Sequence, residues 1–244
     1  MRGAMGGPLR KEATTHAAQK GLRFTLAGVA AEALPEGALW IPDHDALVVS
    51  DLHLEKGSAF AARGQLLPPY DTRATLHRLA ALIARLHPAI VVSLGDSFHD
   101  AGGPTRMHAD DLRALDALVC ATDWVWIVGN HDPALPAALR GRIHETLRVG
   151  ALTLRHEPTA NCAGEIAGHL HPCAKVAARG RAVRTRCFAT DGAQLVMPAF
   201  GAYAGGLNVR DDAFGDIFPR GCTALMLGRA RVYAAPSHRQ VGEA

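Results

Sequence analysis

The sequence predicts an α/β protein in which two mixed β-sheets pack face to face and helices lie outside them. Two observations support this fold class. Three apolar segments, residues 46–50, 89–94 and 124–128, alternate with two amphipathic segments, which is the order of a parallel sheet with right-handed crossovers. After residue 143 the sequence is poor in helical periodicity and rich in hairpin signals, which favours a second sheet packed on the first.

Composition indicates a single domain in a reducing compartment. The 244 residues are enough for one well-buried domain, which we expect over residues 22–244. Residues 1–21 are polar, glycine-rich and basic, so we expect a disordered leader, with Met5 as an alternative start.

The five cysteines show no C-x-x-C spacing, which favours the cytoplasm over a disulfide framework. No apolar run approaches the roughly 18 residues of a membrane span, and we expect no membrane association. The net charge of +3 is compatible with an anionic substrate.

The first half should contain most of the helices. Short strands separated by Pro and Gly turns are expected at residues 22–26, 29–33 and 38–41. Residues 51–70 are expected to form a long irregular connection. The first helix follows, with Asp71 suited to cap it and Pro88 ending it.

A second helix is expected over residues 106–120, with Leu112, Leu115 and Leu118 facing inward, and a short third helix over residues 133–140. A long irregular loop is expected at 201–218. The expected strands of the second half are 143–149, 151–155, 176–178, 181–189, 194–197, 223–227 and 231–234.

Polar motifs follow each of the three buried strands. They are D-L-H at 51–53, G-D at 95–96 and G-N-H-D at 129–132, and later come the lone His156 and G-H-L-H at 168–171. Ligands in open α/β sheets collect at the carboxyl ends of strands, so this placement favours one shared site. In an extended segment, residues i and i+2 point to the same side, which would pair Asp51 with His53 and His169 with His171.

These motifs together offer two carboxylates, an amide oxygen and at least four imidazoles. This mixture of nitrogen and oxygen donors suits Mn²⁺, Fe or Zn²⁺ and does not suit a Ca²⁺ cage. Each motif also has an ordinary interpretation, because polar residues and glycines are common in the turns after strands. Their joint occurrence in this order, each at a strand terminus, favours a metal site.

The five motifs, in this order, resemble the calcineurin-like metallophosphoesterase superfamily over about residues 22–233. Three segments, 50–57 (S-D-L-H-L-E-K-G), 95–100 (G-D-S-F-H-D) and 201–206 (G-A-Y-A-G-G), resemble its bacterial ligase-associated DNA damage response endonuclease branch. The resemblance implies a metallophosphoesterase-type β-sandwich of two mixed sheets flanked by helices, with four layers in the order αββα.

The resemblance also implies a pair of divalent ions, Mn²⁺ in the first place and Fe or Zn²⁺ as alternatives. The implied ligands are Asp51, His53 and His171 for one metal, Asp96 as a bridge, and Asn130, His156 and His169 for the second. Two such ions would hold a bridging hydroxide for in-line attack on phosphorus.

The residues next to the implied ligands are candidates for catalysis and substrate binding. Asn130 and His131 are expected to contact the substrate. His131 is also expected to protonate the leaving group, oriented by the carboxylate of Asp132. His99 stands where many relatives carry Asp, which leaves the roles of His99 and Asp100 open.

The branch implies a phosphodiesterase or endonuclease acting on DNA in repair, with a functional association with a DNA ligase and helicase system. Two alternatives remain. One is a phosphatase or phosphodiesterase acting on small nucleotides or phosphoproteins, and the other is an inactive scaffold of the same fold, which the complete ligand set disfavours.

The arginine-rich hairpin at 179–186 is explained either by contact with nucleic acid or by a solvated strand face, and the second explanation is preferred. Lys56, Arg63 and Arg155 are further candidates for contact with substrate phosphates.

Overall fold

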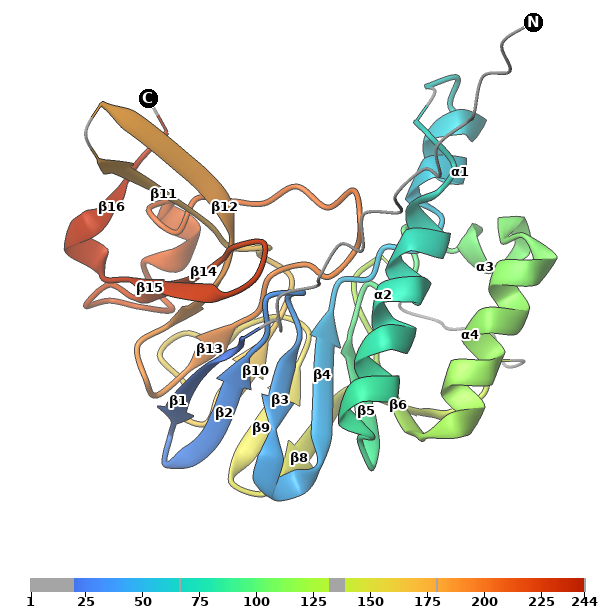
Figure 1. The fold of residues 1–244 in the computed structure, drawn as a ribbon, viewed down its shortest axis with the longest axis horizontal. Coiled ribbons are helices and arrows are strands. Elements are labelled where there is room, and N and C mark those ends of the chain that lie inside the picture. The colour runs from blue at the N-terminus through green and yellow to red at the C-terminus, as the bar shows by residue number, and fades with distance from the viewer. Residues whose placement is uncertain (1–19, 66, 132–138, 179, 244) are drawn as a thin grey trace, which may run out of the picture.

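The computed structural model describes residues 20–65, 67–131, 139–178 and 180–243, and it consists of two sheets with the helices gathered beside the first (Figure 1). The expected leader lies outside the described residues except for Lys20 and Gly21, and most of the helix expected at 133–140 also lies outside them. In the described part of the chain, no helix is long and apolar enough to cross a membrane.

The first sheet has seven strands that follow one another in chain order. They are β1 (Leu22–Leu26), β2 (Val29–Ala33), β3 (Leu39–Ile41), β4 (Ala46–Ser50), β5 (Ile90–Leu94), β6 (Asp123–Ile127) and β7 (Arg142–His144). The pairs from β1 to β4 are antiparallel, and those from β4 to β7 are parallel. The predicted parallel arrangement of the three buried strands is therefore confirmed, and their carboxyl ends share one edge of the sheet.

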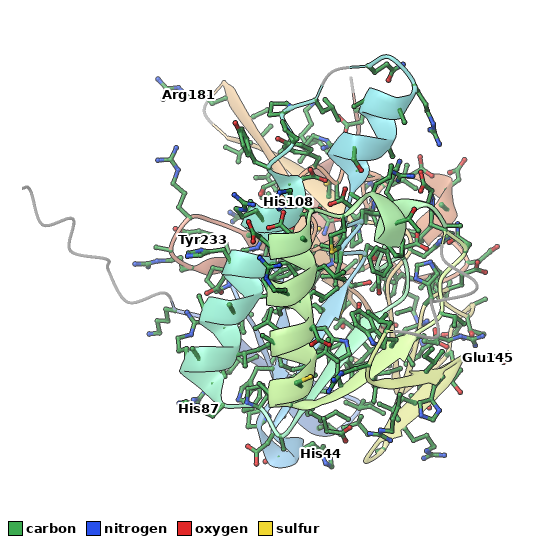
Figure 2. All side chains as sticks on the ribbon, turned by 90° about the vertical axis from the view of Figure 1, so that its right-hand side faces the viewer. His44, His87, His108, Glu145, Arg181 and Tyr233 are labelled. Carbon is green, nitrogen blue, oxygen red and sulfur yellow. The ribbon has the colours of Figure 1, made fainter. Side chains whose placement is uncertain are left out.

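Two helices, α2 (Asp71–Leu86) and α4 (Ala109–Ala121), cover the outer face of this sheet (Figures 1 and 2). Leu79 of α2 and Leu115 of α4 are fully buried in a cluster with Trp124 of β6. The exposed His87 and His108 lie at the ends of these helices, His87 after α2 and His108 before α4 (Figure 2).

Three sequence expectations for the helices were wrong. The helix expected over 106–120 is divided into α3 (Gly103–Arg106) and α4, and Leu112 is 45% exposed because it lines a surface hollow beside Pro104. Asp71 does not cap α2; its carboxylate accepts a hydrogen bond from the backbone N of Gly57 instead.

The expected irregular connection 51–70 contains a helix, α1 (Lys56–Ala62), with seven residues. This helix has a glycine and only one large apolar residue, so it lacks the apolar periodicity that predicts a helix.

The second sheet has nine strands. They are β8 (Thr146–Val149), β9 (Leu152–Arg155), β10 (Glu165–Ala167), β11 (Cys173–Ala178), β12 (Arg181–Thr190), β13 (Leu195–Val196), β14 (Thr223–Leu227), β15 (Val232–Ala235) and β16 (Gln240–Val241). The single strand expected at 143–149 was wrong, because the chain leaves the first sheet after β7 and enters the second at β8. The short strands β10 and β16 were not expected.

The main core lies between the two sheets. Val48 and Val92 of the first sheet pack in one buried cluster with Leu154 and Phe188 of the second. The outer face of the second sheet is covered by the segment 209–222, where Phe214 lies in a single 3-10 turn. The predicted fold class, two mixed sheets packed face to face with flanking helices, is confirmed.

Candidate metal centre

The seven side chains proposed as metal ligands all follow strands. Asp51, Asp96 and Asn130 come after β4, β5 and β6 of the first sheet, His156 follows β9, and His169 and His171 follow β10 of the second sheet. The structure brings these residues into two adjoining groups, so the site is built where the two sheets meet.

The first group consists of Asp51, His53 and His171, whose donor atoms lie within 4.8 Å of one another. Nε2 of His53 is 3.2 Å from Nε2 of His171, which in turn is 3.1 Å from Oδ1 of Asp51. The other oxygen of Asp51, Oδ2, accepts hydrogen bonds from the hydroxyl of Ser50 and from the backbone N of His169. Oδ1 is buried and accepts none, so it remains available to a cation.

The second group consists of Asp96, His156 and His169, with Asn130 between the two imidazoles. Oδ1 of Asn130 lies 2.8 Å from Nε2 of His156 and 3.0 Å from Nδ1 of His169. Nδ1 of His156 donates to the carbonyl of Leu94 at 2.9 Å, which leaves the lone pair of a neutral His156 on Nε2.

Asp96 is 2% exposed and stands between the two groups. Its Oδ1 is 3.4 Å from Nε2 of His156, and its Oδ2 is 4.0 Å from Nε2 of His53. One carboxylate oxygen therefore faces each group. The backbone N of His131 donates to Oδ1 at 2.9 Å and helps to hold the carboxylate in this orientation.

The donor chemistry fits divalent cations. Lone-pair nitrogens and carbonyl-type oxygens face one another at 2.8–3.2 Å, and such acceptors repel unless a cation or a proton lies between them. Burial lowers the pKa of His53 to about 3, so its ring stays neutral and keeps a lone pair at neutral pH. Burial alone would raise the pKa of Asp51, but the adjacent rings of His171 and His156 and the hydroxyl of Ser50 lower it, and the carboxylate stays ionised.

The backbone at the site is unusual. Five of the seven residues, namely Asp51, His53, Asp96, His169 and His171, have positive φ angles between 42° and 69°. The expectation that Asp51–His53 and His169–His171 are extended pairs was therefore wrong, because left-handed residues, and not strand alternation, turn these side chains inward. Each such conformation costs about 1–3 kcal/mol and persists only where surrounding contacts determine it.

Glycines make room for this close assembly. A Cβ atom on Gly168 would lie 1.9 Å from Oγ of Ser50 and 2.7 Å from Oδ2 of Asp51, and one on Gly95 would lie 2.3 Å from Nδ1 of His156. Gly95 also has a φ of 70°. Both motifs therefore need glycine for steric reasons.

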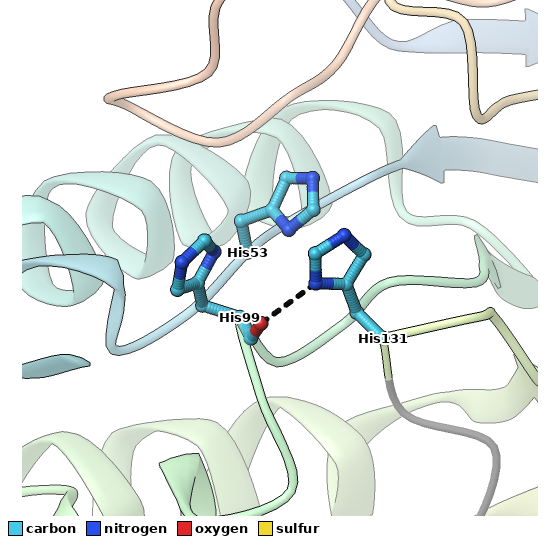
Figure 3. A group of neighbouring side chains, drawn as sticks. All are labelled: His53, His99 and His131. Atoms are coloured by element: carbon cyan, nitrogen blue, oxygen red, sulfur yellow. Dashed lines mark hydrogen bonds between the residues drawn. The ribbon is translucent and has the colours of Figure 1, made fainter. Parts of the chain in front are cut away.

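His131, the expected proton donor, lies at the edge of the two groups with its side chain 43% exposed. Its Nδ1 donates to the carbonyl of His99 at 2.9 Å, and its Nε2 is 4.0 Å from Oδ2 of Asp96. Figure 3 shows His53, His99 and His131 facing one another, and their nitrogens form a third cluster within 4.8 Å. Asp132, expected to orient His131, lies outside the described residues.

His99 and Asp100, whose roles the motifs left open, differ in their surroundings. His99 stacks on His131 at 5.6 Å between ring centres, and burial together with the charge of Lys56 lowers its pKa. Asp100 instead pairs with Arg106 at 2.7 Å.

Several other basic candidates are engaged in internal contacts. Arg155 pairs with Glu165 at 3.6 Å, Arg184 pairs with Glu243 at 2.7 Å, and Arg186 donates to the carbonyls of Ala199 and Gly201. Arg181 is exposed, and Arg179 lies outside the described residues. The exposed Arg181 and Arg184 fit the preferred explanation of a solvated strand face, whereas Arg186, bonded to backbone carbonyls, fits neither explanation.

Sequence reasoning missed the support that the segment 199–201 gives to the site. Phe200 N and Gly201 N donate to the carbonyls of Ser50 and Asp51, and the ring of Phe200 lies 4.3 Å below the guanidinium of Arg78. Such contacts join residues about 150 positions apart, so no local pattern predicts them.

A model of the calcineurin-like phosphoesterase family matches residues 45–174, more than half of the chain. Among solved structures, nuclease MPE from Pseudomonas putida is 25% identical with a TM-score of 0.68, and the match covers 88% of this chain and 100% of that one. Yfce, a phosphoesterase from E. coli, is 15% identical with a TM-score of 0.40, and the match covers 81% of this chain and 98% of that one. No significant match is found among curated proteins.

Proposed function

Since the chain belongs to the calcineurin-like phosphoesterase family and is a metal-dependent hydrolase, we propose that it is a binuclear phosphodiesterase that cleaves DNA. In this proposal Asp51, His53 and His171 bind one divalent ion, and Asn130, His156 and His169 bind a second. Asp96 bridges them. Mn²⁺ is the proposed ion, because the ligands mix imidazole with carboxylate and amide oxygens.

The placement of Asp96 carries the proposal. Its two oxygens face different imidazole groups, at 3.4 Å from His156 and 4.0 Å from His53. One carboxylate that serves two neighbouring cations is the arrangement that a two-metal hydrolase requires. Bound as a pair, such cations lower the pKa of water towards about 7 and neutralise the charge of the phosphate.

Side chains of the protein supply the remaining steps. His131 stands beside Asp96, and its Nδ1–H is engaged with the carbonyl of His99, so in the doubly protonated ring Nε2 is the nitrogen that can give its proton to the leaving oxygen. Asn130 is exposed and turns its amide oxygen to His156, and its amide nitrogen is the group proposed to contact a phosphate oxygen.

DNA is the proposed substrate because the structural likeness to the Pseudomonas putida nuclease extends over nearly the whole chain. The segments at 50–57, 95–100 and 201–206 support the same branch. A role in DNA repair, with a functional association with a DNA ligase and helicase system, belongs to the same proposal.

The test is metal-dependent cleavage by the purified full chain. Chelated protein is titrated with Mn²⁺, Fe²⁺ or Zn²⁺ and assayed on single-stranded DNA, double-stranded DNA, a cyclic dinucleotide and a phosphopeptide. We expect cleavage of DNA that rises to saturation near two equivalents of Mn²⁺.

Other results would contradict separate parts of the proposal. Saturation at one equivalent contradicts the binuclear site. Turnover of only the small nucleotide or only the phosphopeptide assigns the protein to another substrate class of the family.

A further inference from the structure

Helix α1 carries an aromatic ring that lies beside the candidate metal centre and is not part of an apolar core. The ring of Phe60 is 5.7 Å from that of His99, and Nζ of Lys56 lies 5.9 Å from the centre of the Phe60 ring. Lys56 and Phe60 are one helical turn apart and share a face of α1. Within the described part of the chain, Phe60 belongs to none of the three buried apolar clusters. Packing therefore does not account for this half-buried ring.

The base of α1 is fixed by side-chain hydrogen bonds. The backbone N of Glu55 donates to Oγ1 of Thr72 at 2.8 Å, and that of Gly57 donates to Oδ2 of Asp71 at 3.0 Å. A Cβ on Gly57 would lie 2.6 Å from Oδ1 of Asp71, so the close approach requires glycine.

A third anchor joins α1 to α3, because Nε of Arg106 donates to Oγ of Ser58 at 3.1 Å. Phe60 is thus presented by a pre-organised element, as a binding surface requires, and Figure 1 shows α1 rising beyond the ends of β4 and β5.

Three neighbouring rings connect helix α1 with the proposed metal ligands. The ring of His99 stacks on that of His131 with 5.6 Å between centres and 27° between planes, and His131 adjoins Asp96. Phe60, His99 and His131 therefore line a path from the exposed side of α1 to the two ligand groups. Figure 3 shows the end of this path at His53.

We propose that Phe60 and His99 form a subsite for the nucleobase next to the scissile phosphate, and that Lys56 contacts the adjacent phosphate. The inference rests on the proposed function, because it presupposes a nucleic-acid substrate. Every nucleobase offers a flat face to an aromatic ring, so such stacking tolerates any sequence. The ammonium of Lys56 lies beside the ring, where it reaches a phosphate as a point charge. A base can enter this subsite only after it leaves its stack in the strand.

The experiment uses the Mn²⁺-loaded full chain and dinucleotides that contain one phosphodiester bond and terminal phosphates. In matched analogues, one deoxyribose or the other lacks its base. We expect the wild type to prefer the base-bearing substrate to one of these analogues by about 5- to 150-fold in kcat/KM. Phe60→Ala should abolish this preference, and Phe60→Tyr, which keeps the ring, should retain it.

Lys56 is tested with the same dinucleotides made with and without terminal phosphates. Lys56→Ala should lose the preference for the phosphorylated form and keep the preference for the base. The manganese content of every variant should equal that of the wild type, which separates the subsite from the metal centre.

The failure of the subsite differs from the failure of the proposed function. The subsite is overturned if the wild type has the same kcat/KM for the base-bearing substrate and both base-free analogues. It is also overturned if Phe60→Ala lowers kcat/KM by the same factor on all three substrates. In both cases the proposal of DNA cleavage stands. Absence of cleavage of any DNA by the wild type overturns the proposed function.

Discussion

At the scale of single residues, the site depends on side chains whose atoms are divided between tasks. Asp51 uses Oδ2 for hydrogen bonds and leaves Oδ1 free, and His156 donates from Nδ1 and leaves Nε2 free. This division orients each donor atom before any ion arrives. The residue types and their order could be predicted from the sequence, but the choice of donor atom could not, because it depends on contacts such as that with the carbonyl of Leu94.

Asp96 should be required at both metal positions. We expect Asp96→Ala to lose both ions, because each of its oxygens faces a different group. Metal analysis of the dialysed variant measures this directly. Asp100→Ala is the matched control, since Asp100 pairs with Arg106 outside the two groups and its loss should leave two ions bound. A variant without Asp96 that retains both ions would contradict the bridging role.

His131 should affect turnover and not metal content. His131→Ala removes the proposed proton donor, and loss of general acid catalysis lowers kcat by about 10²- to 10⁴-fold. Single-turnover kinetics of the variant, with two ions verified, would measure the effect. His87→Ala, at the exposed end of α2, provides the control with unchanged kinetics. Undiminished turnover in His131→Ala would remove this residue from the mechanism.

At the scale of elements, helices and strands were predicted correctly where burial or alternation of apolar residues marks them in the sequence. They were missed where contacts with distant parts of the chain determine the local conformation. The buried strand β4 was predicted with its observed bounds, because it consists of consecutive apolar residues. Helix α1 was missed because the anchors Asp71, Thr72 and Arg106 belong to other elements. The left-handed turns of the ligands were missed for the same reason, since Asp and His give only a weak local signal for positive φ.

The turn after β10 offers a test of this packing. Gly168→Ala places a methyl group against Ser50 and Asp51, and overpacking of this kind costs about 1–3 kcal/mol. We expect a lower free energy of unfolding in denaturant together with weaker manganese binding in calorimetry. Gly205→Ala, where a Cβ meets no atom within 4 Å, should change neither quantity. Wild-type metal affinity in Gly168→Ala would show that the turn is not tightly constrained.

At the scale of the whole molecule, the proposed ions join two sheets. Asp51, Asp96 and Asn130 follow strands of the first sheet, whereas His156, His169 and His171 follow strands of the second. The two-sheet architecture followed from the change in sequence character near residue 143. The position of one sheet against the other could not be predicted from the sequence, because it depends on how side chains interdigitate in the shared core.

Metal removal should therefore lower the stability of the entire fold. Ligands that bind only the native state add about 2.7 kcal/mol each at 100 times their Kd, and about 1 kcal/mol shifts Tm by 2–4 °C for a domain of this size. We expect chelation to lower Tm by about 10–20 °C under those conditions, and Mn²⁺ to restore it. Calorimetric scans with and without chelator measure the shift. An unchanged Tm would mean that the ions do not bind the folded protein in preference to the unfolded chain.

The support given by Phe200 and Gly201 to the backbone of Ser50 and Asp51 has a consequence for biosynthesis. A ribosome delivers the aspartate long before it delivers the segment that braces it, and the histidines at 169 and 171 also emerge late. An incomplete polypeptide that lacks these residues consequently lacks part of the proposed metal centre. In the proposed assembly, the metal centre gains this support only after synthesis has passed residue 201.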